Sequence, residues 1–294
     1  MTNPTAMLFG TVAARLAPKE VNHISDAAFQ VSSQWGEDGI IDWLIGRLPN
    51  PVPSFVEFGV EHYTEANTRF LLQHRNWRGL IADGSTEAIT AIRQTDLMWR
   101  YDLTAVHRFI DPGNINGLFS ENGFTGEIGL LSVDIDGQDY WVWKAIDVVK
   151  PQIVICEYNA VFGDLHAISV PSNPSFDRTA AHTSNLYWGS SIGAVEYLAR
   201  SKGYTLVGSN LEGCNAFFVR DDLMTHYAVI KDRSAKPSLY RESRRPDSSL
   251  SYIRGRARAD VIGSMPVCAV ETGFEFPLRD LGDLYSEKWL RAMG

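Results

Sequence analysis

The chain has 294 residues, of which 45% are hydrophobic and 21% are charged, as is typical of a globular protein with a sizeable core. Its formal net charge of -8 argues against a nucleic-acid partner, and no apolar run is long enough for a membrane-spanning helix. The N-terminus does not resemble a secretion signal, and the three scattered cysteines lack metal-ligand spacing, so we expect a cytoplasmic protein with reduced thiols.

The first part of the chain alternates between segments of helical and of strand character. Residues 1–30 have little periodicity, and we expect an N-terminal arm there. Ser32–Leu48 has the apolar spacing of an amphipathic helix, with Ser32 or Ser33 as its cap. Strands are then expected at Ser54–Gly59, at Gly79–Ala82 and within Tyr101–Phe109, and helices around Phe70, over Glu87–Arg93 and near Leu118.

The centre of the chain reads as a strand, a crossover helix and a second strand. The apolar runs Ile128–Val133 and Ile153–Cys156 are each followed by an acid, and Trp141–Val149 between them has helical spacing that Pro151 interrupts. Continuous apolar strands joined by a helix predict a parallel sheet covered on both faces. Because ligands bind at the carboxyl ends of such strands, we expect the functional site there.

The later part of the chain closes the sheet. Val161–Asn185 is long and rich in Ser, Pro, Asn and His, and both a lid over a substrate and a disordered insertion remain open. Ser191–Gly203 has helical spacing. Tyr204–Gly208 and Ala216–Arg220 are expected to form an antiparallel hairpin at the edge of the sheet.

These elements predict an α/β fold with a doubly wound, Rossmann-like and mostly parallel sheet. We expect the main domain to span residues 31–225, with the arm at 1–30 before it. Residues 226–294 are expected to form a C-terminal basic extension packed on the same domain. Within it, residues 231–258 hold nine Lys or Arg against three acids, and this segment either meets an anionic acceptor or forms a solvated surface.

Two strand ends have the chemistry of a nucleoside site. Gly59 ends the first strand, where a glycine lets the backbone approach a ligand. Asp83 ends the next strand, 26 positions after Glu57, where an acid suits two ribose hydroxyls. The phosphate-binding GxGxxG is absent, since residues 57–64 read EFGVEHYT. A nucleoside without phosphates, of which S-adenosylmethionine is the commonest, therefore fits better than a dinucleotide.

Five segments resemble the FkbM-type branch of the class I S-adenosylmethionine-dependent methyltransferases: SQWGEDGIIDWL, FVEFG, NWRGLIADGS, LLSVDIDGQDYWVW and GCNAFFVRDD. The most specific of them is Asp134-Ile-Asp136-Gly137, which is similar to the family's Asp-x-Glu-Gly after its fourth strand. The resemblance implies a seven-stranded methyltransferase sheet with an antiparallel edge strand. It also implies a cofactor site, to which we assign six residues: Gln34, Asp38, Glu57, Gly59, Asp83 and Ser85.

The acids after the two central strands predict how an acceptor is activated. A hydroxyl is a poor nucleophile and needs a general base or a Lewis-acid metal. We assign Asp134, Asp136 and Glu157 as catalytic residues. Asp134, Glu157 and Asn159 offer hard oxygen ligands that suit Mg²⁺ or another divalent cation. The alternative is that Asp136 and Asp139 cap the next helix and that Glu157 makes a buried hydrogen bond.

The sequence thus predicts an O-methyltransferase that uses S-adenosylmethionine, with or without a divalent metal, on a hydroxyl of a sugar, glycan or natural product. A non-catalytic module of the same fold that binds a glycan or a partner protein is the alternative. A nucleotide-dependent oxidoreductase is disfavoured by the missing glycine fingerprint. We expect a small-molecule or glycan acceptor, no nucleic acid and no membrane span, while the formation of a homo-oligomer stays open.

Overall fold

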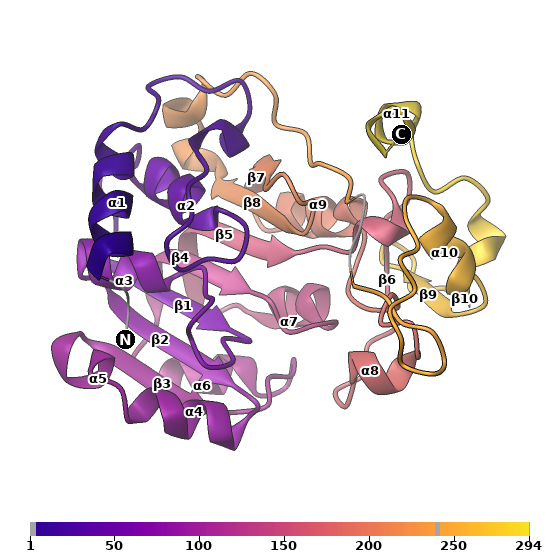
Figure 1. Ribbon diagram of the computed structural model, residues 1–294, viewed down its shortest axis with the longest axis horizontal. Coiled ribbons are helices and arrows are strands. Elements are labelled where there is room, and N and C mark those ends of the chain that lie inside the picture. Colours follow the sequence, from indigo (N-terminus) through magenta and orange to yellow (C-terminus); the bar gives the residue numbers. More distant parts are fainter. Residues whose placement is uncertain (1–3, 239–241, 294) are drawn as a thin grey trace.

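A seven-stranded sheet organises the fold (Figure 1). The computed structural model describes residues 4–238 and 242–293. The strand order of the sheet is β3-β2-β1-β4-β5-β8-β7. Its strands are β1 (Ser54–Phe58), β2 (Arg78–Asp83), β3 (Leu103–His107), β4 (Gly126–Val133), β5 (Val149–Glu157), β7 (Tyr204–Ser209) and β8 (Asn215–Arg220).

The sheet is parallel except at one edge. β1 pairs with β2 and β4, β2 with β3, and β4 with β5, all in parallel. β8 runs antiparallel to β5 on one side and to β7 on the other, so the hairpin closes the edge with β7 outermost. The predicted fold class is therefore confirmed: the sheet is the mostly parallel, Rossmann-like sheet of the class I methyltransferases, with the expected antiparallel hairpin.

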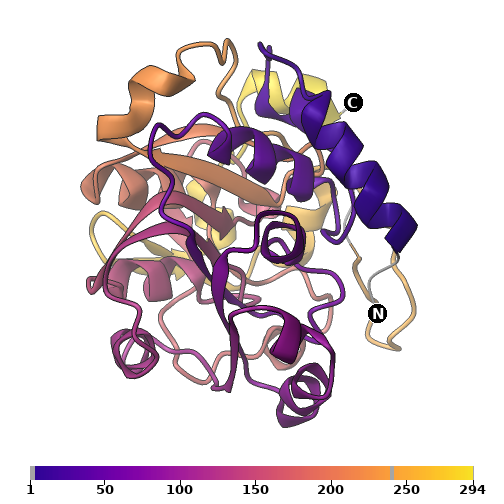
Figure 2. The same ribbon diagram turned by 90° about the vertical axis from the view of Figure 1, so that its left-hand side faces the viewer.

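Helices cover both faces of the sheet, because successive residues of a buried strand point to opposite sides. Leu131 and Val154 share a hydrophobic core with α6 (Ile115–Glu121), α7 (Asp139–Ala145) and α9 (Ile192–Ser201). Leu130 and Ile153, one position earlier, share another with α2 (Glu37–Ile45), α3 (Arg69–Arg75) and α4 (Thr86–Arg93). On this second side, α1 (Pro4–Arg15) lies outermost against α2 and α3, and α5 (Leu97–Arg100) contacts α4 (Figure 2).

A second, smaller sheet lies beyond α7 (Figure 1). It has the order β10-β9-β6, formed by β6 (Ile168–Ser169), β9 (Pro266–Ala269) and β10 (Glu275–Pro277). Sequence patterns did not predict it, because β6 is only two residues long and its partner follows about a hundred positions later. β6 belongs to the long polar segment 161–185, which also contains α8 (Arg178–Ala181). Pairing with β9 therefore anchors part of that segment.

The C-terminal part of the chain contributes to one of the two hydrophobic cores. It contains α10 (Ala257–Val261) and α11 (Glu287–Met293). Val267, Leu278 and Trp289 belong to the same hydrophobic core as Leu131. Residues 1–3 of the expected arm, and 239–241 and 294 of the expected extension, lie outside the described residues. No helix of the described chain is long and apolar enough to cross a membrane.

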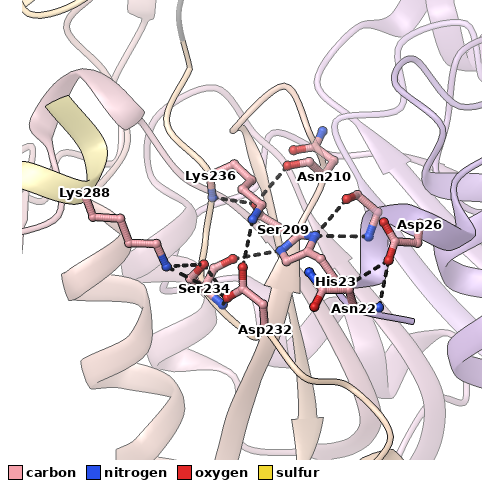
Figure 3. Close-up of polar contacts among 10 residues, drawn as sticks. Asn22, His23, Asp26, Ser209, Asn210, Asp232, Ser234, Lys236 and Lys288 are labelled. Carbon is pink, nitrogen blue, oxygen red and sulfur yellow. Dashed lines mark hydrogen bonds and ion pairs between the residues drawn. The ribbon is translucent and has the colours of Figure 1, made fainter. Parts of the chain in front are cut away.

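Polar contacts around His23 join the residues before β1 to those after β8 (Figure 3). His23 Nε2 donates to the carbonyl oxygen of Ser234 over 2.9 Å. Asp232 lies between two lysines, with Lys236 Nζ at 3.1 Å and Lys288 Nζ at 3.9 Å from its carboxylate oxygens. His23 is buried, with an exposed fraction of 3%. The segment around residue 23 is therefore fixed to residues 232–236 through a network whose central imidazole is buried.

The crossover helix is shorter than the predicted segment Trp141–Val149. α7 ends at Ala145, and Val149 already begins β5. Pro151 therefore does not end a helix but lies inside β5, where it is the parallel partner of Ile128. Residues 146–148 connect the two elements, and the helical spacing of the predicted segment beyond Ala145 was coincidental.

Candidate active site

Two adjoining cavities open at the carboxyl ends of the parallel strands. The first has a volume of about 270 Å³ and is lined by residues that follow β1, β2, β3 and β4. The second, of about 350 Å³, is bounded mainly by residues 176–179 and 185 of the long polar segment. Four residues line both cavities: Phe109, Ile135, Asp136 and Phe176. The two cavities therefore meet at the edge of the sheet where ligands bind in open α/β folds.

Gly59 lines the first cavity in a conformation that favours glycine. Its φ is +71°, and a Cβ placed there would lie 1.7 Å from the carbonyl oxygen of Asp134. Its N–H donates to the carbonyl oxygen of Ala82 over 3.1 Å. Gly59 thus allows the backbones at the ends of β1, β2 and β4 to approach one another closely at the cavity wall.

Asp83 lines the same cavity at the end of β2. One of its oxygens accepts the N–H of Glu61 and the other accepts the N–H of Ser85, both over 2.7 Å. Each carboxylate oxygen keeps a second lone pair, so the group is oriented by the backbone and can still accept from a ligand. Ser85 acts as the cap of α4, because its Oγ accepts the N–H of Ala88 over 3.1 Å.

Glu57 is buried behind this wall, with an exposed fraction of 4%. It accepts the N–H of Asn67 over 2.8 Å, the N–H of Thr68 over 3.0 Å and the Thr68 hydroxyl. Asn67 Nδ2 in turn donates to Ser132 Oγ on β4 over 3.1 Å. Burial raises the pKa of Glu57 to about 7, against the effect of these donors. The side chain therefore holds the turn between β1 and α3 in place.

Asp38 orders the loop before α2. Its Oδ2 accepts the backbone N–H groups of residues 31, 32 and 33 over 2.7–2.8 Å. The helix predicted to start at Ser32 therefore begins only at Glu37, although Ser33 Oγ does accept the N–H of Asp38. Burial raises the pKa of Asp38 to about 6. Gln34 is exposed, and its carbonyl oxygen accepts from the Gln30 side chain over 3.1 Å.

Three carboxylates meet where β4 and β5 end. One oxygen from each of Asp134, Asp139 and Glu157 lies within 4.8 Å of the others, and the last two side chains are buried. Asp139 accepts the N–H of Ile135 over 2.8 Å and that of Gly137 over 3.1 Å, so it holds the turn before α7. Burial raises the pKa of Asp139 to about 7. The structure thus brings Asp134 and Glu157 together, with Asp139 as a third acid.

Asn159 uses its side chain for backbone contacts. Its Nδ2 donates to the carbonyl oxygens of Leu186 and Trp188, each over 2.9 Å. Its Oδ1 accepts the N–H of Val161 over 3.0 Å, at the start of η2 (Ala160–Phe162). A role as a metal ligand would have to use the remaining lone pair of that oxygen.

Asp136 lies where the cavities meet. Its φ is +55°, a conformation uncommon for a residue with a side chain and often found at functional sites. Arg178 Nη1 donates to Asp136 Oδ1 over 2.7 Å, and Arg178 Nε donates to the carbonyl oxygen of Asn185 over 3.0 Å. The guanidinium also lies over the Trp188 ring, 4.7 Å from its centre. Arg178 therefore connects the long polar segment to the end of β4.

Sequence reasoning missed three members of this region. Asp139 was visible in the SVDIDGQD motif but was interpreted only as a helix cap. Phe176 and Arg178 lie in a segment without periodicity, and Arg178 is 42 positions from its carboxylate partner. The only available signal was the presence of an aromatic and a basic residue in an otherwise small and polar stretch.

Comparisons with known proteins add little to this description. No known protein family and no curated protein matches the sequence. Among solved structures, an O-methyltransferase family protein from Burkholderia thailandensis is 14% identical with a TM-score of 0.38, and the match covers 63% of this chain and 58% of that one. A S-adenosylmethionine-dependent methyltransferase from Clostridium acetobutylicum is 11% identical with a TM-score of 0.38, covering 63% of this chain and 90% of that one.

The chain also resembles the CMeT domain of the citrinin polyketide synthase, with 13% identity and a TM-score of 0.38, but spans only 51% of that chain. Likenesses at this level define neither a family nor a reaction. The class of fold follows instead from the strand order and the antiparallel hairpin of the sheet. Membership of the FkbM-type family stays a prediction.

Proposed function

We propose that the protein is a S-adenosylmethionine-dependent methyltransferase. The observation that carries the proposal is the first cavity, where Gly59 and Asp83 line one wall at the ends of neighbouring parallel strands. The Gly59 backbone can be approached closely by a ligand, and two N–H groups hold the Asp83 carboxylate beside it. This pair suits a nucleoside with two free ribose hydroxyls. In the proposal Glu57 and Asp38 position the surrounding turns.

The charge of the site supports a cationic ligand. S-adenosylmethionine carries a positive sulfonium, and several carboxylates lie near the cavities. Glu57 and Asp139 are buried, and burial raises the pKa of each to about 7. A positive charge brought near them would favour their ionised forms. Binding of the cofactor would therefore relieve part of the cost of burying these acids.

We propose a hydroxyl as the acceptor, on a sugar, glycan or natural product. A carboxylate takes the hydroxyl proton while the oxygen attacks the methyl carbon, and the carbon–sulfur bond breaks to leave S-adenosylhomocysteine and a methyl ether. Asp136 is the proposed base, because it lines both cavities and Arg178 orients it. Asp134 and Glu157, which lie close to each other where β4 and β5 end, are further proposed catalytic acids.

A divalent cation is compatible with this arrangement. Asp134, Asp139 and Glu157 supply hard oxygen atoms close enough to converge on one ion. Such an ion would polarise the acceptor hydroxyl. A bound ion stabilises the folded protein by mass action, so Mg²⁺ should raise the melting temperature of the wild type and not that of Glu157→Gln. No rise in the wild type at millimolar Mg²⁺ would remove the metal from the proposal.

Calorimetry with S-adenosylhomocysteine tests the cofactor site. Asp83→Ala removes the proposed partner of two ribose hydroxyls, and a loss of roughly 1.5 kcal/mol per bond predicts an affinity at least about tenfold weaker. Asp102→Ala is the matched control, because Asp102 is an exposed acid that lies before β3 and outside both cavities. Equal affinities in wild type and Asp83→Ala would refute the ribose assignment.

The same experiment separates the alternative functions. A wild type that binds no S-adenosylhomocysteine would refute the methyltransferase proposal and leave a non-catalytic module of this fold.

We also propose the domain division predicted from sequence, with residues 31–225 as the methyltransferase domain, 1–30 as an arm and 226–294 as an extension packed on it. The shared core of Leu131 and Trp289 and the contacts around His23 support this division.

A further inference from the structure

The second cavity has the chemistry of a specific acceptor site. Its volume of about 350 Å³ is near the lower end of the roughly 300–1,000 Å³ that small-molecule sites occupy. Phe109 and Phe176 form its apolar walls and also face the first cavity. Ile135 is a further apolar residue of the lining. The others are polar, and most of them present oxygen atoms that accept hydrogen bonds: Asp136, Asp177, Arg178, Thr179, Asn185 and Glu242. The cavity is therefore suited to a ligand rich in donors.

One of these acceptors is buried and unsatisfied. Asn185 Oδ1 is inaccessible to solvent and has no hydrogen-bond partner among the described residues. Asn185 also has a φ of +58°, in the left-handed region. A buried carbonyl oxygen without a donor costs free energy. Because Asn185 Oδ1 is closed off from the cavity as well as from bulk solvent, it reaches a donor of a ligand only when the Asn185 side chain turns toward the cavity.

The charges of the cavity disfavour an anionic ligand. Three carboxylates line it against a single cation, Arg178. That guanidinium is committed to Asp136, to the Asn185 carbonyl oxygen and to the face of Trp188. Arg108, the cation of the adjoining cavity, donates to Glu121 over 3.0 Å. Within the described parts of the chain, no cavity-lining cation is left to pair with a phosphate or carboxylate.

The basic segment 231–258 pairs with one of the three carboxylates in the part that the structure describes, which leaves Asp177 as the lining carboxylate without a described arginine partner. Arg244 donates to Glu242 and to the carbonyl oxygen of Ser248, and Arg245 donates to that of Leu250 over 2.7 Å. Arg258 is buried and donates to the carbonyl oxygen of Ser238. These side chains stabilise the turns of their own segment.

We propose that the second cavity binds the methyl acceptor and that the acceptor is a hydroxylated molecule with a protonated amine, such as an amino sugar. Asp177 selects the amine together with Glu242, which shares its second carboxylate oxygen with the ligand while the first accepts from Arg244, because an ammonium group offers three donors and a positive charge. The phenyl rings of Phe109 and Phe176 pack against the apolar face of the ring that bears the hydroxyls. The inference rests on the proposed function, which places the methyl donor in the first cavity.

The test compares three probes of one shape and different charge: glucosamine, glucose and glucose 6-phosphate. Their dissociation constants are measured by ligand-observed NMR at slightly acidic pH, with the protein saturated with S-adenosylhomocysteine. One added charge-assisted contact predicts glucosamine to bind at least about tenfold more tightly than glucose. Glucose 6-phosphate should bind more weakly than glucose.

Two variants identify the carboxylates responsible. In the double variant Asp177→Asn, Glu242→Gln the preference for glucosamine should fall to about twofold or less, while the affinity for glucose stays within about twofold of the wild type. Glu287→Gln on α11, an exposed acid outside both cavities, should keep the full preference. The melting temperature of each variant shows that it is folded.

Three results would overturn the inference: glucose 6-phosphate binding as tightly as glucosamine, a preference that survives the double variant, or no binding of glucosamine up to tens of millimolar. In each case S-adenosylhomocysteine would still bind, and the proposed function would stand. Loss of S-adenosylhomocysteine binding in the wild type would instead refute the proposed function. The two failures are therefore distinguishable.

Discussion

Replacing Glu57 by Gln should change how the stability of the protein depends on pH. The Glu57 carboxylate is buried and accepts from the backbone of Asn67 and Thr68 and from the Thr68 hydroxyl. An amide keeps the shape of the side chain but has one oxygen, so one N–H donor loses its acceptor. A buried, unsatisfied donor costs about 1–3 kcal/mol, and the variant should be less stable than the wild type by that amount near pH 5.

The difference should then shrink as the pH rises. Burial raises the pKa of Glu57 from 4.5 to about 7, so between these values the folded protein keeps a proton that the unfolded chain has lost. Stability therefore falls with rising pH, by about 1.4 kcal/mol per pH unit for this one group. From about pH 5 to pH 7 this contribution changes by roughly 2 kcal/mol, because the full slope does not apply close to either of the two pKa values. The glutamine variant lacks it, so the two curves should approach each other near pH 7.

Urea unfolding at a series of pH values measures both the difference in stability near pH 5 and its change with pH. EDTA is present to exclude divalent cations. The free energy of unfolding of the wild type minus that of Glu57→Gln should decrease by about 2 kcal/mol across this range. In the control Glu121→Gln, which removes an exposed carboxylate, the free energy of unfolding should depend on pH as it does in the wild type. A constant difference between wild type and Glu57→Gln would refute the raised pKa, and with it the argument that burial outweighs the three donors.

Three further predictions follow from named contacts. Gly59→Ala should lower the free energy of unfolding by about 2 kcal/mol or more and abolish S-adenosylhomocysteine binding, because its Cβ would meet the Asp134 carbonyl oxygen at a φ of +71°. An alanine variant that binds S-adenosylhomocysteine as tightly as the wild type in calorimetry would contradict this. Segment 161–185 should gain protection from hydrogen exchange around α8 only when cofactor and acceptor are both bound, whereas equal protection in the free protein would identify it as a fixed wall. Burial lowers the pKa of His23, and its Nδ1 accepts the N–H of Ser25, so the imidazole must be neutral in the folded state. The contribution of His23 to stability should therefore fall as the pH drops through about 6.5. Thermal unfolding between pH 7.5 and 5.5 should show the free energy of unfolding of the wild type, minus that of His23→Gln, decreasing over this range.

The sequence determined most of the architecture because it depends on local patterns. Continuous apolar runs such as Ile128–Val133 require burial on both faces, and alternation with helices leaves few arrangements other than a doubly wound sheet. Gly59 and Asp83 could be placed at one cavity from sequence alone, because both end strands of a parallel sheet and such ends lie at the same edge. Boundaries were less predictable: the helical spacing of Trp141–Val149 was outweighed at its end by the pairing of β5 with β4, which begins at Val149.

Only the tertiary structure decided how the acids are used. Asp134, Asp139 and Glu157 converge because the turn before α7 folds back on β5, whereas the Asn159 amide turns to backbone groups near residues 186–188. Arg178 contacts Asp136 across 42 positions, in a segment that the pairing of β6 with β9 anchors. Contacts of this kind depend on non-local pairing and on the direction of single side chains, which neither periodicity nor composition encodes. The sequence by itself therefore determined the sheet and the edge that holds the site, and the tertiary structure decided which side chains face its two cavities.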